Sequence, residues 1–267
     1  MYNLDDLRNI MERLRDPEHG CPWDREQTLE TLVSYTLEEA YEVVDAIHRG
    51  NDQELCDELG DLLFQIIFYT QITREENKFS FDDIVDAIAI KLVRRHPHVF
   101  ADEQINNAKE QTLAWEEHKE KERKEKADNK NIRASVLDGV SLALPALVRA
   151  EKLQKRASRV GFDWEDIQSV ISKVEEELGE YKEECLNDTD RVKERIQEEM
   201  GDLLFSCVNL ARHAGIDAES ALREANLKFE GRFNAIEVAL EQQGRSIEQA
   251  SLEEMDRLWE KAKQVMI

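Results

Sequence analysis

The segments EELGE (176–180) and EEMGDLLF (198–205) decide the fold of this chain. Residues three apart lie on one face of a helix, so each segment would present two acidic side chains in one direction. Carboxylates on two facing helices repel one another unless a hard divalent cation lies between them, and an all-oxygen donor set favours Mg²⁺ or Mn²⁺ over zinc. The segments therefore predict a metal site. Its expected ligands, which are also the expected catalytic residues, are Glu177, Glu180, Glu199 and Asp202.

The same pattern occurs a second time, in EEAYE (38–42) and DELGDLLF (57–64). Glu177 lies 138 residues after Glu39, and Glu199 lies 141 residues after Glu58. A Trp-Asp or Asp-Trp pair precedes each set of acids, and a Lys-x-x-x-Arg spacing and a Trp-x-x-x-Lys spacing follow each set in the same order. A repeat near half the chain length predicts a duplicated domain. The second set of metal ligands would be Glu39, Glu42, Glu58 and Asp61.

The predicted fold class is all-α, with two helical-bundle domains in tandem. The chain contains only 10 Gly and 4 Pro, and no window alternates polar and apolar residues as a strand would. We place the domains at residues 1–130 and 131–267, with the boundary just after a mixed-charge run at 117–126. The expected helices are residues 3–15, a helix from Asp24 to Arg49, one that begins after Asn51, one that begins after Ser80 and is stopped by Pro97, one from Asn106 through Trp115, and residues 145–159, 166–186, 190–213, 217–241 and 252–265.

Several local signals support these helices. Asp24 with Gln27, Asn51 with Glu54 and Ser80 with Asp83 have the spacing of N-terminal capping pairs, and Gly50 suits a helix C-terminus. Gly60 and Gly201 lie in mid-helix, where Gly costs about 1 kcal/mol relative to Ala, so we expect a neighbour to approach the backbone there. An apolar stripe beside Glu58 and Asp61 is expected to bury a core; it comprises Leu55, Leu59, Leu62, Leu63, Ile66 and Ile67.

The composition limits the function classes. The chain has 267 residues, with 59 acidic against 36 basic side chains and a formal charge of −23, which argues against nucleic acid as a partner. The four cysteines show no CxxC spacing, which is typical of a reduced protein. The N-terminus has no signal-peptide pattern, and no apolar run is long enough to span a bilayer. We therefore expect a cytoplasmic protein without membrane contact.

Other side chains suggest a binding site for an anion. Lys228 and Arg232 lie four apart, as do Lys91 and Arg95, and such a pair can hold phosphate oxygens. The alternative for Lys228 and Arg232 is a pair of surface cations that forms ion pairs with Glu224 or Glu230. Trp164 and Trp259 are more often core aromatics than platforms for a nucleotide base. A glutamate-rich helix is also commonly a solvated face, but the paired and repeated spacing of these acids favours a metal site.

The chain resembles the MazG family of the all-α nucleoside triphosphate pyrophosphohydrolase superfamily. The motifs that carry this resemblance extend over nearly the whole chain. They are CPWD (21–24), LEEAYE (37–42), RRHPHVF (94–100), RAxxVGFDW (156–164) and EMGDLLF (199–205).

The resemblance implies hydrolysis of nucleoside triphosphates to NMP and diphosphate with Mg²⁺, and a homodimer built by helix packing. It implies that the four acids of the C-terminal copy hold the metal and that this copy is the more dependable catalyst, while the N-terminal copy keeps all four of its acids and its activity stays open. Water would attack the α-phosphorus, with Glu176 or Glu198 orienting it. The residues implied to line the nucleotide site are Lys173, Glu176, Arg195, Glu198, Lys228, Arg232 and Trp259.

Two other readings follow from the residues. The chain could be a helical interaction module that binds a regulatory nucleotide or a structural cation without turnover. A di-iron carboxylate bundle would need Glu-x-x-His pairs, and the chain has none.

Overall fold

The computed structural model describes residues 1–101, 135–186 and 192–265, together with positions 107, 110, 111, 114, 115, 119, 121, 122, 125 and 133. Every regular element among these residues is helical, so the all-α prediction is confirmed. The chain divides into two units, Met1–Lys119 and Glu120–Ile267. The predicted boundary between residues 130 and 131, and most of the helix expected from Asn106, lie outside the described residues.

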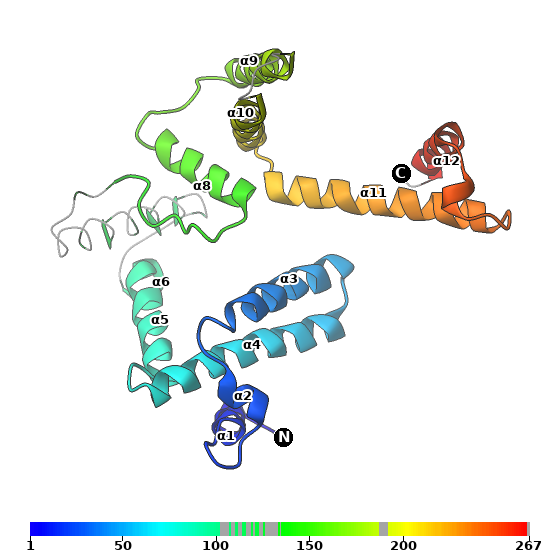
Figure 1. Cartoon of the computed structure of the whole chain (residues 1–267). Coiled ribbons are helices and arrows are strands. Elements are labelled where there is room, and N and C mark those ends of the chain that lie inside the picture. Colours follow the sequence, from blue (N-terminus) through cyan, green and yellow to red (C-terminus); the bar gives the residue numbers. More distant parts are fainter. Residues whose placement is uncertain are drawn as a thin grey trace. The chain divides into compact units, whose positions relative to one another are not determined.

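The N-terminal unit is built around two long helices that lie side by side, α3 and α4 (Figure 1). Helices α1 and α5 also pack on α4. The bounds are α1 Leu4–Leu14, α2 Pro22–Glu26, α3 Val33–Arg49, α4 Asp52–Glu75, α5 Phe81–Arg95 and α6 Pro97–Phe100.

Local capping chemistry fixes the ends of these helices. The Asn51 side chain accepts hydrogen bonds from the backbone N–H groups of Gln53 and Glu54, and Ser80 and Asp83 form a reciprocal capping box. Gly50 ends α3 with φ 67°, a left-handed conformation that suits glycine. These three predictions are confirmed. The short link at Gly50 and Asn51 makes α3 and α4 antiparallel neighbours, which brings their acidic faces together.

The prediction for Asp24 is wrong. Asp24 lies inside α2 and is buried, while Cys21 is the N-terminal boundary residue and Pro22 occupies the first turn. Proline is favoured there because its missing N–H group has no partner in a first helical turn. The long helix expected from Asp24 is consequently interrupted, and α3 begins only at Val33.

The loop before α2 depends on Gly20. A Cβ atom added to this residue would lie 2.6 Å from the Asp16 carbonyl oxygen, closer than real side chains approach backbone. The Gly20 N–H group also donates a 2.9 Å hydrogen bond to that oxygen. The absence of a side chain therefore allows the chain to turn back on α1 at this point.

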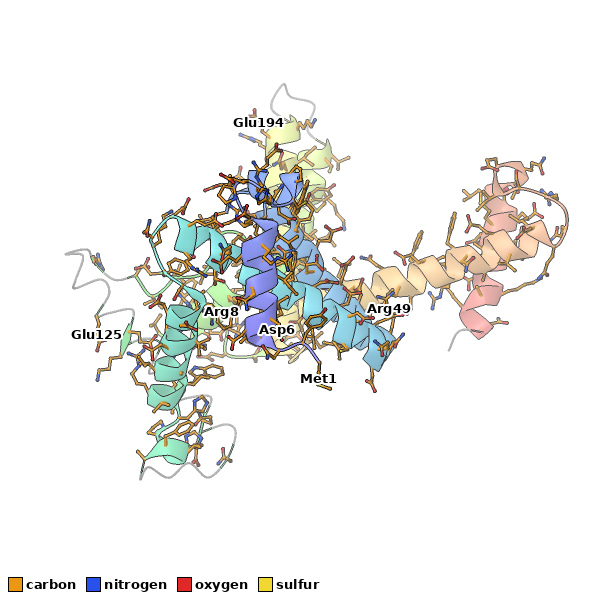
Figure 2. The ribbon with its side chains drawn as sticks, turned by 90° about the horizontal axis from the view of Figure 1, so that it is seen from below. Met1, Asp6, Arg8, Arg49, Glu125 and Glu194 are labelled. Atoms are coloured by element: carbon orange, nitrogen blue, oxygen red, sulfur yellow. The ribbon has the colours of Figure 1, made fainter. Side chains whose placement is uncertain are left out.

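A small core joins α1, α4 and the turn before α3. Its buried members are Met11, Leu32, Ile67, Phe68 and Ile72. Charged contacts at the rim add to this packing, because Arg8 of α1 donates two 3.1 Å hydrogen bonds to the Asp82 carboxylate of α5 (Arg8 is labelled in Figure 2). Arg8 also lies over the ring of Phe81. The core thus holds α4 against α1 and the turn that leads into α3.

The C-terminal unit repeats the pair of long helices. Helix α9 packs on α10, α8 packs on both α10 and α11, and α12 packs on α11. Gln154 of α8 donates a 2.9 Å hydrogen bond to the Phe205 carbonyl oxygen, which connects α8 to the helix that carries two of the predicted ligands. The bounds are α8 Ala146–Ser158, α9 Ile167–Leu186, α10 Val192–His213, α11 Ala218–Glu241, a 3₁₀ helix Ile247–Gln249 and α12 Leu252–Val265, close to the predicted ranges.

The apolar stripe of α4 is only partly covered. Ile67 is buried, but Leu59 is 49% exposed and Ile66 is 40% exposed. The expectation that the whole stripe enters a core is therefore wrong for this chain by itself. The C-terminal unit has the same property, since Leu204, Phe205 and Phe229 are also exposed.

The four cysteines are free. Among the described helices, none combines the length and the apolar character that crossing a bilayer requires.

Candidate functional site

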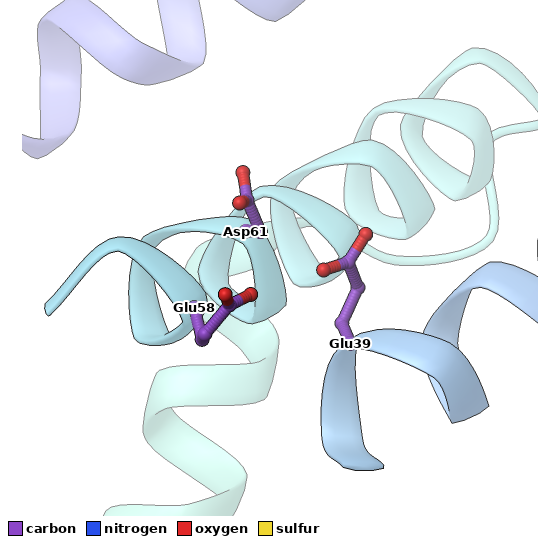
Figure 3. Close-up of side chains that lie close together, drawn as sticks. All are labelled: Glu39, Glu58 and Asp61. Carbon is purple, nitrogen blue, oxygen red and sulfur yellow. The ribbon is translucent and has the colours of Figure 1, made fainter. Parts of the chain in front are cut away.

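Three acids of the N-terminal unit meet between α3 and α4. Glu39 comes from α3, and Glu58 and Asp61 come from α4, one helical turn apart. Each offers a carboxylate oxygen within 4.8 Å of those of the other two. Figure 3 shows the three carboxylates turned toward the space between the helices. We call this group the N-terminal cluster.

The C-terminal unit contains the matching group, the C-terminal cluster. Glu177 of α9 and Glu199 and Asp202 of α10 offer carboxylate oxygens that also lie within 4.8 Å of one another. Glu177 is buried, with 6% of its surface exposed. The predicted duplication therefore extends to the side chains, because equal spacing on paired helices produces equal geometry.

The fourth acid predicted for each cluster lies outside the closest group. Glu42 and Glu180 are exposed and are not among the three carboxylates that come within 4.8 Å of one another. Both lie near enough to act electrostatically, since after burial the charge of Glu42 is the next cause that raises the pKa of Glu58, and that of Glu180 the next cause that raises the pKa of Glu199. Mutual repulsion favours an exposed glutamate that turns toward solvent, so three of the four predicted acids converge and the fourth stays beside them.

The crowding of like charge changes the acidity of these groups. Burial raises the pKa of the Glu39 carboxyl, and the charges of Asp61 and Glu42 raise it further. Burial is also the main cause that raises the pKa of Glu58 and of Glu199, and the charges of neighbouring acids raise both values further. The ionised form of each cluster is therefore disfavoured until positive charge is brought to it.

In the C-terminal cluster, part of that positive charge comes from Lys173. Its Nζ lies 2.9 Å from an oxygen of Glu177 and 2.9 Å from an oxygen of Glu176. These two contacts, the one to Glu176 first, hold the pKa of Lys173 well above its usual range. Lys173 and Glu176 thus lie beside the acids, and the ammonium group contacts one of the expected metal ligands directly.

Three of the other predicted nucleotide-site residues, Lys228, Arg232 and Trp259, form a separate group on α11 and α12. The Arg232 guanidinium lies 5.6 Å from the centre of the Trp259 ring, and Trp259 lies 5.3 Å from Phe229. Arg232 Nε is buried without a hydrogen-bond partner among the described residues. Lys228 is exposed one helical turn before Arg232. In the described part of the chain, no hydrogen bond or ion pair joins Lys228 or Arg232 to the acids of α9 and α10.

Arg195 and Glu198 lie at the start of α10, and both are exposed. Arg195 forms an ion pair with Glu184 of α9, with 3.4 Å between nitrogen and oxygen. It therefore joins the two helices and makes no ion pair with the cluster itself.

The sequence reasoning missed an anchor beside this site. Asp163, just before α9, accepts hydrogen bonds from the Arg212 guanidinium and lies 3.0 Å from His213 Nε2, at the end of α10. The bonds from Arg212 are the main cause that lowers the Asp163 pKa to about 2. The repeated Asp-Trp motif was the available signal, but its partner 49 residues later could not be read from spacing.

The sequence profile of the MazG nucleotide pyrophosphohydrolase domain matches this chain twice, over residues 27–100 and 165–236. The chain belongs to the MazG family. The two matched segments contain the N-terminal and the C-terminal cluster respectively, so the MazG domain is present as a tandem pair.

Relatives named nucleoside triphosphate pyrophosphohydrolase, two of them matched along nearly their whole length, agree with this MazG assignment. A nucleoside triphosphate pyrophosphohydrolase of Escherichia coli K12 is 50% identical over 264 residues, which cover 98% of both chains. A nucleoside triphosphate pyrophosphohydrolase/pyrophosphatase MazG of Thermotoga maritima is 43% identical over 260 residues, covering 97% of this chain and 95% of the relative. A Mycolicibacterium smegmatis nucleoside triphosphate pyrophosphohydrolase is 41% identical over 173 residues, or 64% of this chain and 51% of the relative.

Proposed function

We propose that this MazG protein hydrolyses nucleoside triphosphates to NMP and diphosphate at the C-terminal cluster, with Mg²⁺ as the cofactor and Mn²⁺ as a substitute. The observation that carries the proposal is the convergence of Glu177, Glu199 and Asp202 between two packed helices of a MazG domain. The substrate range includes ribo- and deoxyribonucleotides.

The residues present fit such a cation. The donor set is made entirely of carboxylate oxygens, which is the chemistry that Mg²⁺ and Mn²⁺ prefer. Burial and the neighbouring acids raise the pKa of Glu199. A bound cation would therefore stabilise the ionised form of the cluster. Glu177, Glu199 and Asp202 would hold the ion, with Glu180 beside them as the fourth ligand. The N-terminal cluster, with Glu42, would form the second-copy metal site.

When bound beside the acids, Mg²⁺ supplies positive charge that attracts the phosphate oxygens of the substrate and stabilises the negative charge that develops on these oxygens during the reaction. The chain's own groups complete the site. Lys173, Lys228 and Arg232 would hold the phosphates, while Arg195 would lie at the edge of the site. Trp259 would support the nucleotide base.

The reaction needs an acceptor for one proton of the attacking water. Water adds to the α-phosphorus, the bond from that phosphorus to the bridging oxygen breaks, and diphosphate leaves with the bridging oxygen. Glu198 is exposed next to Glu199 and is the carboxylate proposed to orient the water and accept this proton, with Glu176 as the alternative.

A homodimer is part of the proposal. Leu204, Phe205 and Phe229, large apolar side chains of α10 and α11, are 50%, 44% and 58% exposed. Packing against the helices of a second copy would cover these side chains. Analytical ultracentrifugation should give the mass of two chains, and the mass of one chain would refute this part.

The decisive assay is a panel of NTPs and dNTPs with Mg²⁺ in which diphosphate and inorganic phosphate are measured separately. Diphosphate should form in stoichiometric amount with NMP. Glu177→Gln and Asp202→Asn should each lower the rate by at least about a hundredfold, as expected for loss of a group that places charge at the reacting phosphate. Glu237→Gln, at an exposed position of α11, is the matched control and should retain the wild-type rate.

Retained turnover in both cluster variants would refute the site. Tight NTP binding without diphosphate release by the wild type would refute the activity and indicate a regulatory binding module.

A further inference from the structure

The two clusters differ at the position one helical turn before their first acid. In the C-terminal cluster this position, four residues before Glu177, is Lys173. In the N-terminal cluster the corresponding position, four residues before Glu39, is Tyr35. Tyr35 packs edge-on against Trp23, with 5.8 Å between the ring centres. Only the C-terminal cluster therefore has a cation built into its own helix at this place.

Lys173 occupies a carboxylate that a metal ion would need. Its Nζ lies 2.9 Å from Glu177 Oε1, and the Glu177 side chain is only 8% exposed. The Lys173 side chain is 32% exposed, so the lysine reaches the buried acid from the solvent side. The same Glu177 is the only member of the three-carboxylate group that α9 contributes.

A divalent cation at this group would lie close to the ammonium charge. Two positive charges a few ångströms apart repel strongly, more so beside a partly buried acid than in open water. The cation must therefore either displace Lys173 from Glu177 or bind against its repulsion. A triphosphate changes this balance, because its phosphate oxygens offer Lys173 a new anionic partner.

We propose that Lys173 is an internal counter-ion of Glu177 that makes cation binding and triphosphate binding at the C-terminal cluster depend on each other. Without substrate, Lys173 satisfies the buried acid and weakens cation binding. With substrate, Lys173 moves to phosphate, and Glu177 becomes available to the ion. By thermodynamic linkage, the cation must then increase triphosphate affinity by the same factor as triphosphate increases cation affinity. This inference rests on the proposed function, since it concerns the same site.

The test is a Mn²⁺ titration by calorimetry of the metal-free protein, with and without an ATP analogue that has a methylene group between the α- and β-phosphates. Asp61→Asn is included in every sample so that the N-terminal cluster contributes little. Lys173→Met should bind Mn²⁺ alone about tenfold more tightly, and the gain in Mn²⁺ affinity that the analogue produces should fall by about the same factor. A tenfold change corresponds to about 1.4 kcal/mol.

A second readout does not depend on metal. In EDTA, Lys173→Met should lower the melting temperature, because it leaves Glu177 buried without its partner. Lys182→Met removes the same charge from an exposed position of α9 and should change neither Mn²⁺ affinity nor coupling. Lys173→Arg keeps the charge and should keep the weak binding of Mn²⁺ alone.

The outcomes separate the two proposals. A wild type that binds Mn²⁺ and releases diphosphate, with a Lys173→Met variant that binds Mn²⁺ and the analogue like Lys182→Met, would overturn the counter-ion role alone. A wild type that neither binds Mn²⁺ nor releases diphosphate would overturn the proposed function and this inference together.

Discussion

The N-terminal and C-terminal clusters have the same three-acid geometry in different electrostatic surroundings. At Glu39, burial and the neighbouring acids all raise the pKa of the carboxyl. Beside Glu177 stands Lys173, in direct ion-pair contact. Helix periodicity is enough to preserve the arrangement of ligands through a duplication, whereas the neighbours that adjust its charge can diverge one residue at a time. The difference between the two clusters should therefore appear in ion binding and turnover more than in fold.

The largest effect should come from removing acids in matched pairs. The double variant Glu199→Gln, Asp202→Asn should lower diphosphate release at least about a thousandfold, or about 4 kcal/mol in the barrier. The matching variant Glu58→Gln, Asp61→Asn should keep most of the wild-type rate. Steady-state diphosphate assays measure both. Equal losses in the two variants would mean that the clusters do not differ in function.

The next effect concerns whether the units are independent in stability. Phe68→Ala should destabilise the N-terminal unit by about 3 kcal/mol, because Phe68 is fully buried in its core. This is the lower end of the usual range, since the half-exposed Trp23 ring beside it can move inward. Hydrogen exchange should increase in peptides from α1 and α4 and stay unchanged in peptides from α9 and α10. Increased exchange in α9 and α10 would show that the units unfold together.

The third effect concerns the anchor of the C-terminal unit between Asp163, Arg212 and His213. Asp163→Asn should cost roughly 2 kcal/mol at neutral pH, since it weakens hydrogen bonds between charged groups. The folded pKa of Asp163 is lowered to about 2 from 3.8, so its contribution is complete above about pH 5 and is lost as pH falls through the folded value.

Urea unfolding of the wild type and of Asp163→Asn should therefore differ most near neutrality and converge as the pH approaches 2. Glu165→Gln, at an exposed neighbouring position, serves as the control and should give no such convergence. A stability difference that grows on acidification would have the wrong sign for this anchor.

The smallest effect comes from giving the N-terminal cluster the lysine that it lacks. Tyr35→Lys should weaken Mn²⁺ binding at that cluster about fivefold, close to 1 kcal/mol. Tyr35→Met also loses the ring contact with Trp23 but adds no charge, so it should bind Mn²⁺ like the wild type. Calorimetry in the Glu199→Gln, Asp202→Asn background isolates this cluster. A Tyr35→Lys variant that binds Mn²⁺ unchanged would remove charge as the reason why the clusters differ.

The helices were predictable because their boundaries depend on neighbours in sequence. Ser80 with Asp83 and Asn51 with Glu54 are three residues apart, and Gly50 needs only its own left-handed conformation. The wrong prediction of an N-cap at Asp24 shows the limit of such local signals. The helix begins at Pro22, so that Cys21 is the N-cap and Asp24 lies inside the first turn. Local chemistry therefore predicted most of the fold.

The site was predictable only in part. Spacing placed Glu39, Glu58 and Asp61 on facing helices, but it could not show that Glu42 would stay outside the closest group. Lys173 and Glu177 are four apart, so their contact follows from helix periodicity, whereas Arg195 and Glu184 meet because two helices pack. The exposure of Leu59 and Ile66 depends on which other helices pack against α4, and the spacing of residues along the sequence does not show this.

Three glycines place opposite demands on the chain. At Gly20 an added Cβ atom would clash with backbone atoms of Leu14 and Asp16, so we expect no other residue to be tolerated at this position. At Gly60 and Gly201, apart from the adjoining residues and the backbone of the same helix, no atom of the described residues lies within 4 Å of an added Cβ, so the expected close neighbour is not found there. Saturation mutagenesis scored on folding alone should find Gly20 intolerant and these two helical positions permissive. If the same substitutions at Gly60 and Gly201 lowered the enzymatic activity, a substrate or a second copy of the chain would have to contact the helix backbone at these positions.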